Sequence, residues 1–287
     1  MMIRIDEKDV NNFNFYALRP HLPADRRPYN QITRCKADQL YKEEQEEVSM
    51  LYTPLFWTSF WAEDWLYSTH YRGATRILIS SASSKTGFCL ALAIKKRLEK
   101  TPGLELKVLG LTSKGNKAFV ESLGLYDEVH LYESLDEVDV TAGPYCYVDV
   151  AGNSKLNDEI ILHLGPSMSF GVTLGMSHVN DTTSAATSSI KETAENDTTA
   201  KLEMFFMPEW FAVVRGTTPV KDVAELRKEG WNWIMKDGAE WVNLEASKGK
   251  KKVLETFKRT LKGNVGPDRG LIFSLWEDDE EQLKAKL

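Results

Sequence analysis

The chain has 287 residues, 42% of them hydrophobic, and a formal net charge of -6. A chain of this length and composition can bury a sizeable core, whereas its acidic balance argues against a nucleic-acid partner, whose binding draws on clustered Lys and Arg. The N-terminus lacks the apolar stretch of a signal peptide, and no run approaches the ~18 apolar residues of a spanning helix. We therefore expect a cytoplasmic protein that binds neither nucleic acid nor membrane.

The first part of the chain shows little organisation before a tryptophan-rich helix. Residues 1–50 have no clear periodicity, and we expect no strands there. The next segment, TPLFWTSFWAEDWLYSTHY, predicts a helix with Pro54 in its first turn. Trp57, Trp61 and Trp65 recur every four residues on one face. Either this aromatic stripe packs the helix on a sheet, or it lines a substrate pocket.

From Gly73 onwards, short apolar strands alternate with helices of about ten residues. The strands are RILIS, KVLGLTS, EVHLY, CYVDVAG and SFGVTLGMSH. This alternation predicts an α/β fold with a doubly wound parallel Rossmann sheet. Residues 181–200, rich in Ser and Thr, predict a flexible loop. After it, KLEMFFMPEWFAVV suggests a strand or buried segment, two helical stretches follow, and GLIFSLW predicts a closing strand.

The turn after the first strand has the layout of a phosphate site. Small and polar residues separate RILI from an amphipathic helix, so backbone amides and the positive helix end can meet a pyrophosphate. The three fingerprint positions of a dinucleotide site are Ala82, Ser84 and Gly87. Ala and Ser allow close approach where φ is negative, and the hydroxyls of Ser81 and Ser83 add donors.

The end of the second strand predicts which dinucleotide is bound. An NAD site places an acid there for the ribose 2'-hydroxyl, and that acid would repel a 2'-phosphate. Here the strand ends in Thr112, Ser113 and Lys114, which favours NADP(H). Asn116 and Tyr132 could complete the pocket. The alternative is that these are ordinary solvated loop residues.

The ends of the two following strands should border the same crevice, because ligands of parallel sheets bind at the carboxyl ends of the strands. The residues there are Asp149, Ala151, Gly152, Gly175, Met176 and Ser177. Asp149 is better suited to holding a neighbouring loop than to acting on a substrate. His178 is either a site residue or a helix cap.

Several segments together resemble one known family. ILISSASSKTGFCLAL, LGLTSKGNKAFVESLGLYDEVHLY, YVDVAG and FGVTLGMSH are similar to the cofactor half of zinc-free, quinone-reductase-type medium-chain dehydrogenase/reductases. The segments SSASSKT, GLTS and VDVAG are more similar still to the DUF2855 family, and so are PYN, PLFWTSF, FFMPEW and GLIFSLW. The resemblance covers most of the chain, and it is specific for the family but not for a reaction.

The resemblance implies a site and a domain plan. Residues Ser81, Ala82, Ser83, Ser84, Lys85, Thr86 and Gly87 would hold the pyrophosphate, and Thr112, Ser113, Lys114, Asn116 and Tyr132 the 2'-phosphate. It implies a shortened GroES-like and linker region at 1–73, a Rossmann core at 74–179, a loop at 180–201 and a C-terminal α/β extension at 202–287. Relatives of this kind carry a longer barrel before the linker, and edge-strand homodimers are frequent among them.

The leading hypothesis is an NADPH-dependent, zinc-independent oxidoreductase that reduces a carbonyl or activated alkene of a small molecule. A hydroxyl of Thr58, Tyr29 or Tyr52 would supply the proton. The alternative is a non-catalytic NADP(H)-binding protein, suggested by the short N-terminal region. A third reading is a P-loop phosphotransferase, because Ser84, Lys85 and Thr86 echo a Walker A motif, although its glycines are missing.

Overall fold

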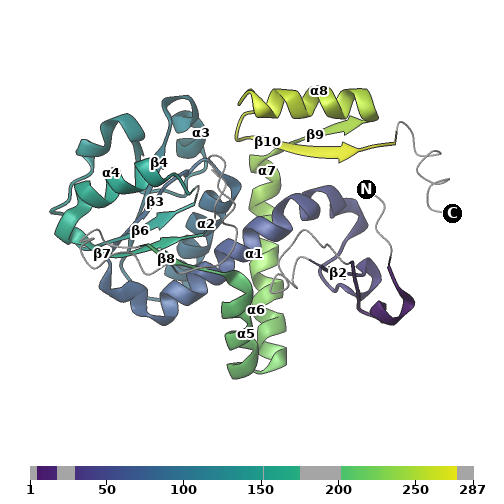
Figure 1. Ribbon diagram of the computed structural model, residues 1–287. Helices are drawn as coiled ribbons and strands as arrows, with labels where there is room; N and C mark the ends of the chain where they lie inside the picture. Colours follow the sequence, from purple (N-terminus) through teal and green to yellow (C-terminus); the bar gives the residue numbers. More distant parts are fainter. Residues whose placement is uncertain (1–4, 18–29, 151, 175–201, 277–287) are drawn as a thin grey trace, which may run out of the picture. The chain divides into compact units, whose positions relative to one another are not determined.

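The computed structural model describes residues 5–17, 30–150, 152–174 and 202–276 (Figure 1). The chain divides into two compact units. The described part of the first is residues 5–17 and 30–46, and that of the second is residues 47–150, 152–174 and 202–276. The expected domain boundaries stay predictions. Within the described ranges, none of the helices has the length and apolar character needed to cross a membrane.

A six-stranded parallel sheet forms the centre of the second unit. Its strands are β3 (Arg76–Ile79), β4 (Lys107–Thr112), β5 (Glu128–Leu131), β6 (Tyr145–Asp149), β7 (Met168–Thr173) and β8 (Glu203–Met204). They are ordered β5-β4-β3-β6-β7-β8, and every neighbouring pair is parallel. This is the 3-2-1-4-5-6 order of the doubly wound fold, so the predicted Rossmann sheet is confirmed.

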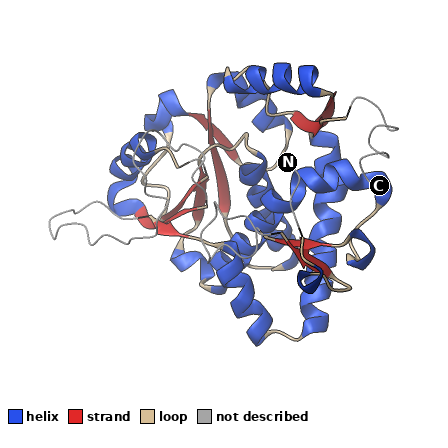
Figure 2. Cartoon of the chain, turned by 45° about the vertical axis from the view of Figure 1, so that its right-hand side comes forward, coloured by secondary structure: helices blue, strands red, loops and turns tan. Residues whose placement is uncertain are grey.

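Crossover helices connect these strands, and Figure 2 shows helices on both sides of the sheet. They are α2 (Lys85–Lys100), α3 (Lys117–Ser122) and α4 (Ser154–Leu164), with shorter turns η6 (Lys114–Asn116), η7 (Tyr132–Glu137) and η8 (Gly165–Ser167). The α2 helix begins where the sequence turns from small to amphipathic residues. Ser84 caps it by accepting a hydrogen bond from the Gly87 amide, at 3.0 Å.

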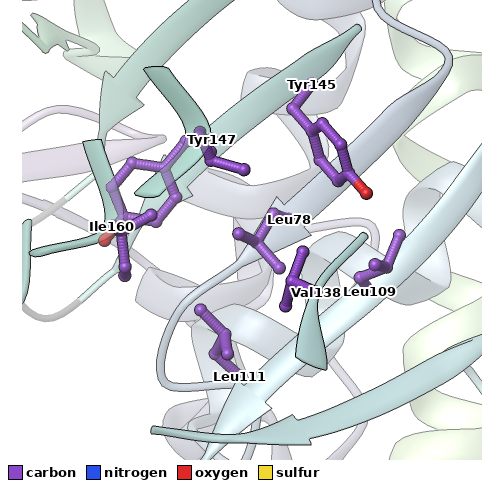
Figure 3. Close-up of a cluster of buried hydrophobic side chains, with 8 residues drawn as sticks. Leu78, Leu109, Leu111, Val138, Tyr145, Tyr147 and Ile160 are labelled. Carbon is purple, nitrogen blue, oxygen red and sulfur yellow. The ribbon is translucent and has the colours of Figure 1, made fainter. Parts of the chain in front are cut away.

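The core of the sheet combines residues of neighbouring strands with α4 (Figure 3). Leu78, Leu109 and Tyr147 come from β3, β4 and β6, and each is fully buried. Ile160 of α4 belongs to the same cluster. Near-continuous apolar strands of this kind are expected where helices cover both faces of a parallel sheet. The packed core therefore keeps the strand ends, which carry the polar residues, at a fixed spacing.

The tryptophan-rich helix is α1 (Glu46–Ser68), which packs within the second unit. It begins earlier than expected, so the prediction that Pro54 lies in the first turn was wrong. Trp57 stacks on Trp231 with ring centroids 5.6 Å apart, and Trp61 contacts Phe211. The stripe is thus a packing surface, and the pocket-wall interpretation is not supported. The following turn is η5 (His70–Gly73).

The C-terminal part adds helices and a small second sheet. Its elements are α5 (Met207–Thr217), α6 (Val220–Trp233), the π-helical η9 (Ile234–Gly238), α7 (Ala239–Trp241), β9 (Asn243–Lys248), α8 (Lys250–Leu261) and β10 (Arg269–Ser274). β9 and β10 pair in parallel, and α8 runs beside them (Figure 1). The closing strand is confirmed. KLEMFFMPEWFAVV begins with the short strand β8, as expected, but from Met207 onwards it is the helix α5, with Pro208 in its first turn.

The first unit contains two short strands that the sequence did not predict. β1 (Asn14–Tyr16) pairs antiparallel with β2 (Gln31–Thr33). The other elements are the 3₁₀ turns η1 (Glu7–Asp9), η3 (Cys35–Ala37) and η4 (Glu43–Gln45). The expectation of no strands in residues 1–50 was wrong, because strands of three residues are too short to show alternation.

Candidate functional site

The turn between β3 and α2 contains backbone amides that are not used by the fold. The amides of Ser81, Ala82 and Ser84 donate to the Tyr132 hydroxyl, the Leu111 carbonyl and the Ser81 carbonyl. Within the described residues, the amides of Ser83, Lys85 and Thr86 have no protein acceptor. The first amides of a helix lack acceptors of their own and lie at its positive end, so this group suits an anion.

Gly87 allows this turn to close tightly. A Cβ atom at Gly87 would lie 2.7 Å from the Ser81 carbonyl oxygen and 3.1 Å from the Ser84 hydroxyl. Gly87 therefore does what the third fingerprint glycine does, which is to let helix and strand pack closely. Gly110 of β4 also allows close packing, because a Cβ atom added there would lie 2.9 Å from the Cβ atom of Ala82.

Two tyrosines fix the path of the turn. The Tyr132 hydroxyl accepts the Ser81 amide at 2.8 Å, and the Tyr126 hydroxyl donates to the Ala82 carbonyl at 2.9 Å. Burial raises the pKa of the Tyr126 phenol well above its ordinary value, so it remains a donor. Ser81 has φ of 51°, in the left-handed region, whereas Ala82 and Ser84 do not have positive φ.

A cavity of about 400 Å³ opens beside this turn. Its walls come from the turn, from the ends of β4 and β5, and from α4. The lining residues are Ser81, Ser83, Thr112, Ser113, Asn116, Tyr132, Asn153, Lys155, Leu156 and Glu159. The Asn116 amide donates to the Ser83 hydroxyl at 3.1 Å, which ties the loop after β4 to the turn. The cavity is thus lined mainly by hydrogen-bonding groups.

Thr112 contributes a buried hydroxyl without a partner. The residue is 1% exposed, and its Oγ1 makes no hydrogen bond to any residue that the structure describes. A buried hydroxyl left unpaired costs about 1–3 kcal/mol, so such groups usually have an acceptor or donor. Thr112 is also one of the residues that line the cavity, so its hydroxyl lies beside the space that a ligand would occupy.

Asp149 is engaged in holding the loop after β6. It is 1% exposed, and its carboxylate accepts hydrogen bonds from the Gly152 amide, the Asn157 side chain and the Thr173 hydroxyl, at 2.9–3.0 Å. These contacts connect β6, α4 and β7. Asp149 therefore holds the neighbouring loop, as the sequence suggested, and it is not among the residues that line the cavity.

A family model matches most of the chain. Residues 1–266 match the family model described as "Protein of unknown function (DUF2855)". The chain belongs to the DUF2855 family. No curated protein matches it.

Three solved structures illustrate what this DUF2855 protein is similar to. The yhdH oxidoreductase of Salmonella enterica in complex with NADP is 13% identical, with a TM-score of 0.46 over 83% of this chain and 64% of the other. A probable oxidoreductase of Mycobacterium abscessus is 16% identical, with a TM-score of 0.44 over 86% of this chain and 67% of the other. CurA of Vibrio vulnificus in complex with NADPH is 15% identical, with a TM-score of 0.48 over 75% of this chain and 61% of the other. This chain spans less than two thirds of the length of the first of these structures.

Six of the predicted cofactor residues line the cavity: Ser81, Ser83, Thr112, Ser113, Asn116 and Tyr132. The other described ones do not; they are Ala82, Ser84, Lys85, Thr86, Gly87, Lys114, Asp149 and Gly152. Lys114 lies on η6, is exposed, and is not among the lining residues. The Lys85 ammonium donates to the carbonyls of Pro267 and Arg269, at 3.1 and 2.8 Å. Burial lowers the pKa of that ammonium. Because its donors face these carbonyls, the expected phosphate contact of Lys85 and the P-loop reading are not supported.

The expected proton donors are not brought together. Tyr52 is fully buried and donates to the Gly238 carbonyl at 2.8 Å, and burial raises the pKa of its phenol. A buried phenol that donates to a backbone carbonyl cannot donate to a substrate, so the prediction that Tyr52 supplies the proton was wrong. The Thr58 hydroxyl donates to Pro54 within α1. Tyr29 lies outside the described residues, as do Ala151, Gly175, Met176, Ser177, His178 and the expected loop at 180–201.

Sequence reasoning missed the wall formed by α4. It followed β6 as far as Gly152 and did not continue to Asn153, Lys155, Leu156 and Glu159, which line the cavity. The signal was the fold order itself, because the helix after the fourth strand of a doubly wound sheet begins beside the ligand crevice. Among the described residues, no group of His, Cys, Asp and Glu could hold a metal ion, and zinc independence stays a prediction.

Proposed function

We propose that this protein binds NADPH at the cavity and reduces a carbonyl or an activated alkene of a small organic molecule. The observation that carries the nucleotide part is the buried Thr112 hydroxyl, unpartnered at the end of β4, where an NAD site would have an acid. The strand order and the free amides of the turn support the same ligand. A cytoplasmic location and a homodimer stay predictions.

The residues present suit each part of the ligand. The amides of Ser83, Lys85 and Thr86 would face the pyrophosphate, and Thr112, Ser113, Asn116 and Tyr132 would surround the 2'-phosphate. Leu156 offers an apolar contact for the adenine ring. When bound, NADPH supplies the hydride that, together with a proton, reduces the acceptor. The assignment of the proton to Thr58 or Tyr29 is part of this proposal.

Binding of NADPH and NADH to the purified chain, measured by calorimetry, tests the cofactor. We expect NADPH to bind at least about tenfold more tightly, and Ser113→Asp to abolish that difference, because its carboxylate would repel the 2'-phosphate. Ser122→Asp, the same change at an exposed position of α3 that does not line the cavity, is the control. Equal affinity of the unaltered chain for the two nucleotides would contradict the proposal.

Oxidation of NADPH with a panel of carbonyls and enones tests the reaction. We expect consumption of NADPH with at least one acceptor. NADPH binding without consumption across the panel would favour the alternative of a non-catalytic NADP(H)-binding protein. Its motivating observation is that neither Tyr52 nor Thr58, two of the expected proton donors, lines the cavity.

A further inference from the structure

The positive charge of the cavity comes from α4 and not from the loop after β4. Lys155 is the cation among the lining residues described above, whereas Lys114 and Lys85 lie elsewhere. The lining also contains one acid, Glu159, on the same helix. The charges of Lys155 and Glu159 cancel while the two side chains are paired. The cavity therefore attracts an anionic ligand only when the Lys155 ammonium, and not the Glu159 carboxylate, faces that ligand.

Lys155 occupies a position that is unfavourable for the helix alone. It lies in the first turn of α4, which contains no acid. The positive end of a helix disfavours a cation there, and a lysine four residues before a glutamate is the weaker orientation of such a pair. Helix stability therefore does not explain this lysine, whereas an anion at the cavity would be attracted by both the lysine and the helix end.

The pairing of Lys155 with Glu159 is easily exchanged. The Nζ and Oε1 atoms are 3.8 Å apart, and the side chains are 89% and 55% exposed. Exposed pairs of this kind contribute about 0–1 kcal/mol. The ammonium can therefore leave the carboxylate for a phosphate at little cost.

We propose that Lys155 is the residue whose charge selects a 2'-phosphorylated nucleotide, with Glu159 as its partner while no nucleotide is bound. The buried Thr112 hydroxyl, the Asn116 amide and the Lys155 ammonium form a donor set suited to a phosphate monoester. This inference rests on the proposed binding of NADPH, and it assigns the selective charge to α4.

Calorimetry with adenosine 2',5'-bisphosphate and adenosine 5'-monophosphate tests the assignment without the nicotinamide half. In Lys155→Ala we expect the bisphosphate to bind about fivefold to tenfold more weakly and the monophosphate to be unchanged. Lys155→Arg should keep most of the affinity. The loss should shrink as salt is added, because the ammonium is exposed.

Lys221 provides a matched control. It lies in the first turn of α6 and is paired with Glu225 four residues later at 3.8 Å, with side chains 82% and 68% exposed. Lys221→Ala should leave both affinities unchanged. Lys114→Ala tests the rival loop lysine, and a loss of bisphosphate affinity there, but not in Lys155→Ala, would overturn the inference.

Glu159→Gln gives a change in the opposite direction. Removing the competing carboxylate should tighten the bisphosphate about twofold to fivefold, because Lys155 no longer has another partner. Equal weakening of both probes in Lys155→Ala would assign the lysine to the 5'-phosphate and overturn the inference. If the unaltered chain binds NADPH selectively and Lys155→Ala changes nothing, the inference fails alone; if the unaltered chain binds no nucleotide, the proposed function fails with it.

Discussion

Ser81 carries the backbone strain of the phosphate turn. Its φ of 51° lies in the left-handed region, which costs a non-glycine residue about 1–2 kcal/mol. We expect Ser81→Gly to raise the free energy of unfolding by about 0.5–1 kcal/mol, because the relief of strain exceeds the added chain entropy of glycine. Denaturant unfolding measures this change.

Ser83→Gly is the matched control at the residue scale. Ser83 lacks a positive φ, and its hydroxyl accepts the Asn116 amide. This variant should lose stability. A destabilised Ser81→Gly would show that the left-handed serine is not a source of strain.

The sequence predicted the location of this turn but not its strained residue. Small residues after an apolar strand indicated the turn, and the fingerprint pointed to Ala82, Ser84 and Gly87. The left-handed residue is instead Ser81, whose amide is held by Tyr132, 51 residues later in the chain. A contact over such a separation leaves no local pattern in the sequence.

At the scale of elements, the closeness of α2 to the turn depends on Gly87. We expect Gly87→Ala to lower the free energy of unfolding by about 1–3 kcal/mol and to weaken NADPH binding by more than about tenfold, because the Ser81 carbonyl must move away from the new methyl group. Thermal unfolding and calorimetry measure the two effects.

Gly216, inside α5, is the control for that substitution. A Cβ atom added at Gly216 would meet no neighbouring atom within 4 Å, so Gly216→Ala should raise stability slightly through helix propensity. If Gly87→Ala kept NADPH affinity, the tight turn would not be what shapes the phosphate site.

Elements with strong periodicity were predicted, and elements that depend on distant contacts were not. The strands β3, β4 and β6 and the helix α2 follow from apolar runs and an amphipathic pattern. The helix α5 was taken for a strand or buried segment because its aromatic residues pack on α1, as Phe211 does on Trp61. The strand β9 alternates weakly and is stabilised by pairing with β10.

At the scale of the molecule, folding divides the three cysteines by reactivity. Cys89 and Cys146 are buried and Cys35 is exposed. Burial raises the pKa of the Cys146 thiol to about 12 and that of Cys89 well above its ordinary value, so little thiolate forms at neutral pH. We expect a thiol reagent to modify Cys35 alone in the folded protein and all the cysteines in denaturant, as mass spectrometry would show. Rapid labelling of Cys89 in the folded protein would contradict the packing around α2.

The hydrogen bonds of Lys85 can form only late in the synthesis of the chain. Its ammonium donates to carbonyls 182 and 184 residues later in the chain. At about 5–20 residues per second, a ribosome needs roughly 10–35 seconds to make that intervening stretch. During this time α2 can form and pack on the first strands, while the Lys85 ammonium is hydrated by water. The contacts that join α2 to Pro267 and Arg269 therefore form only after almost the whole chain has been made.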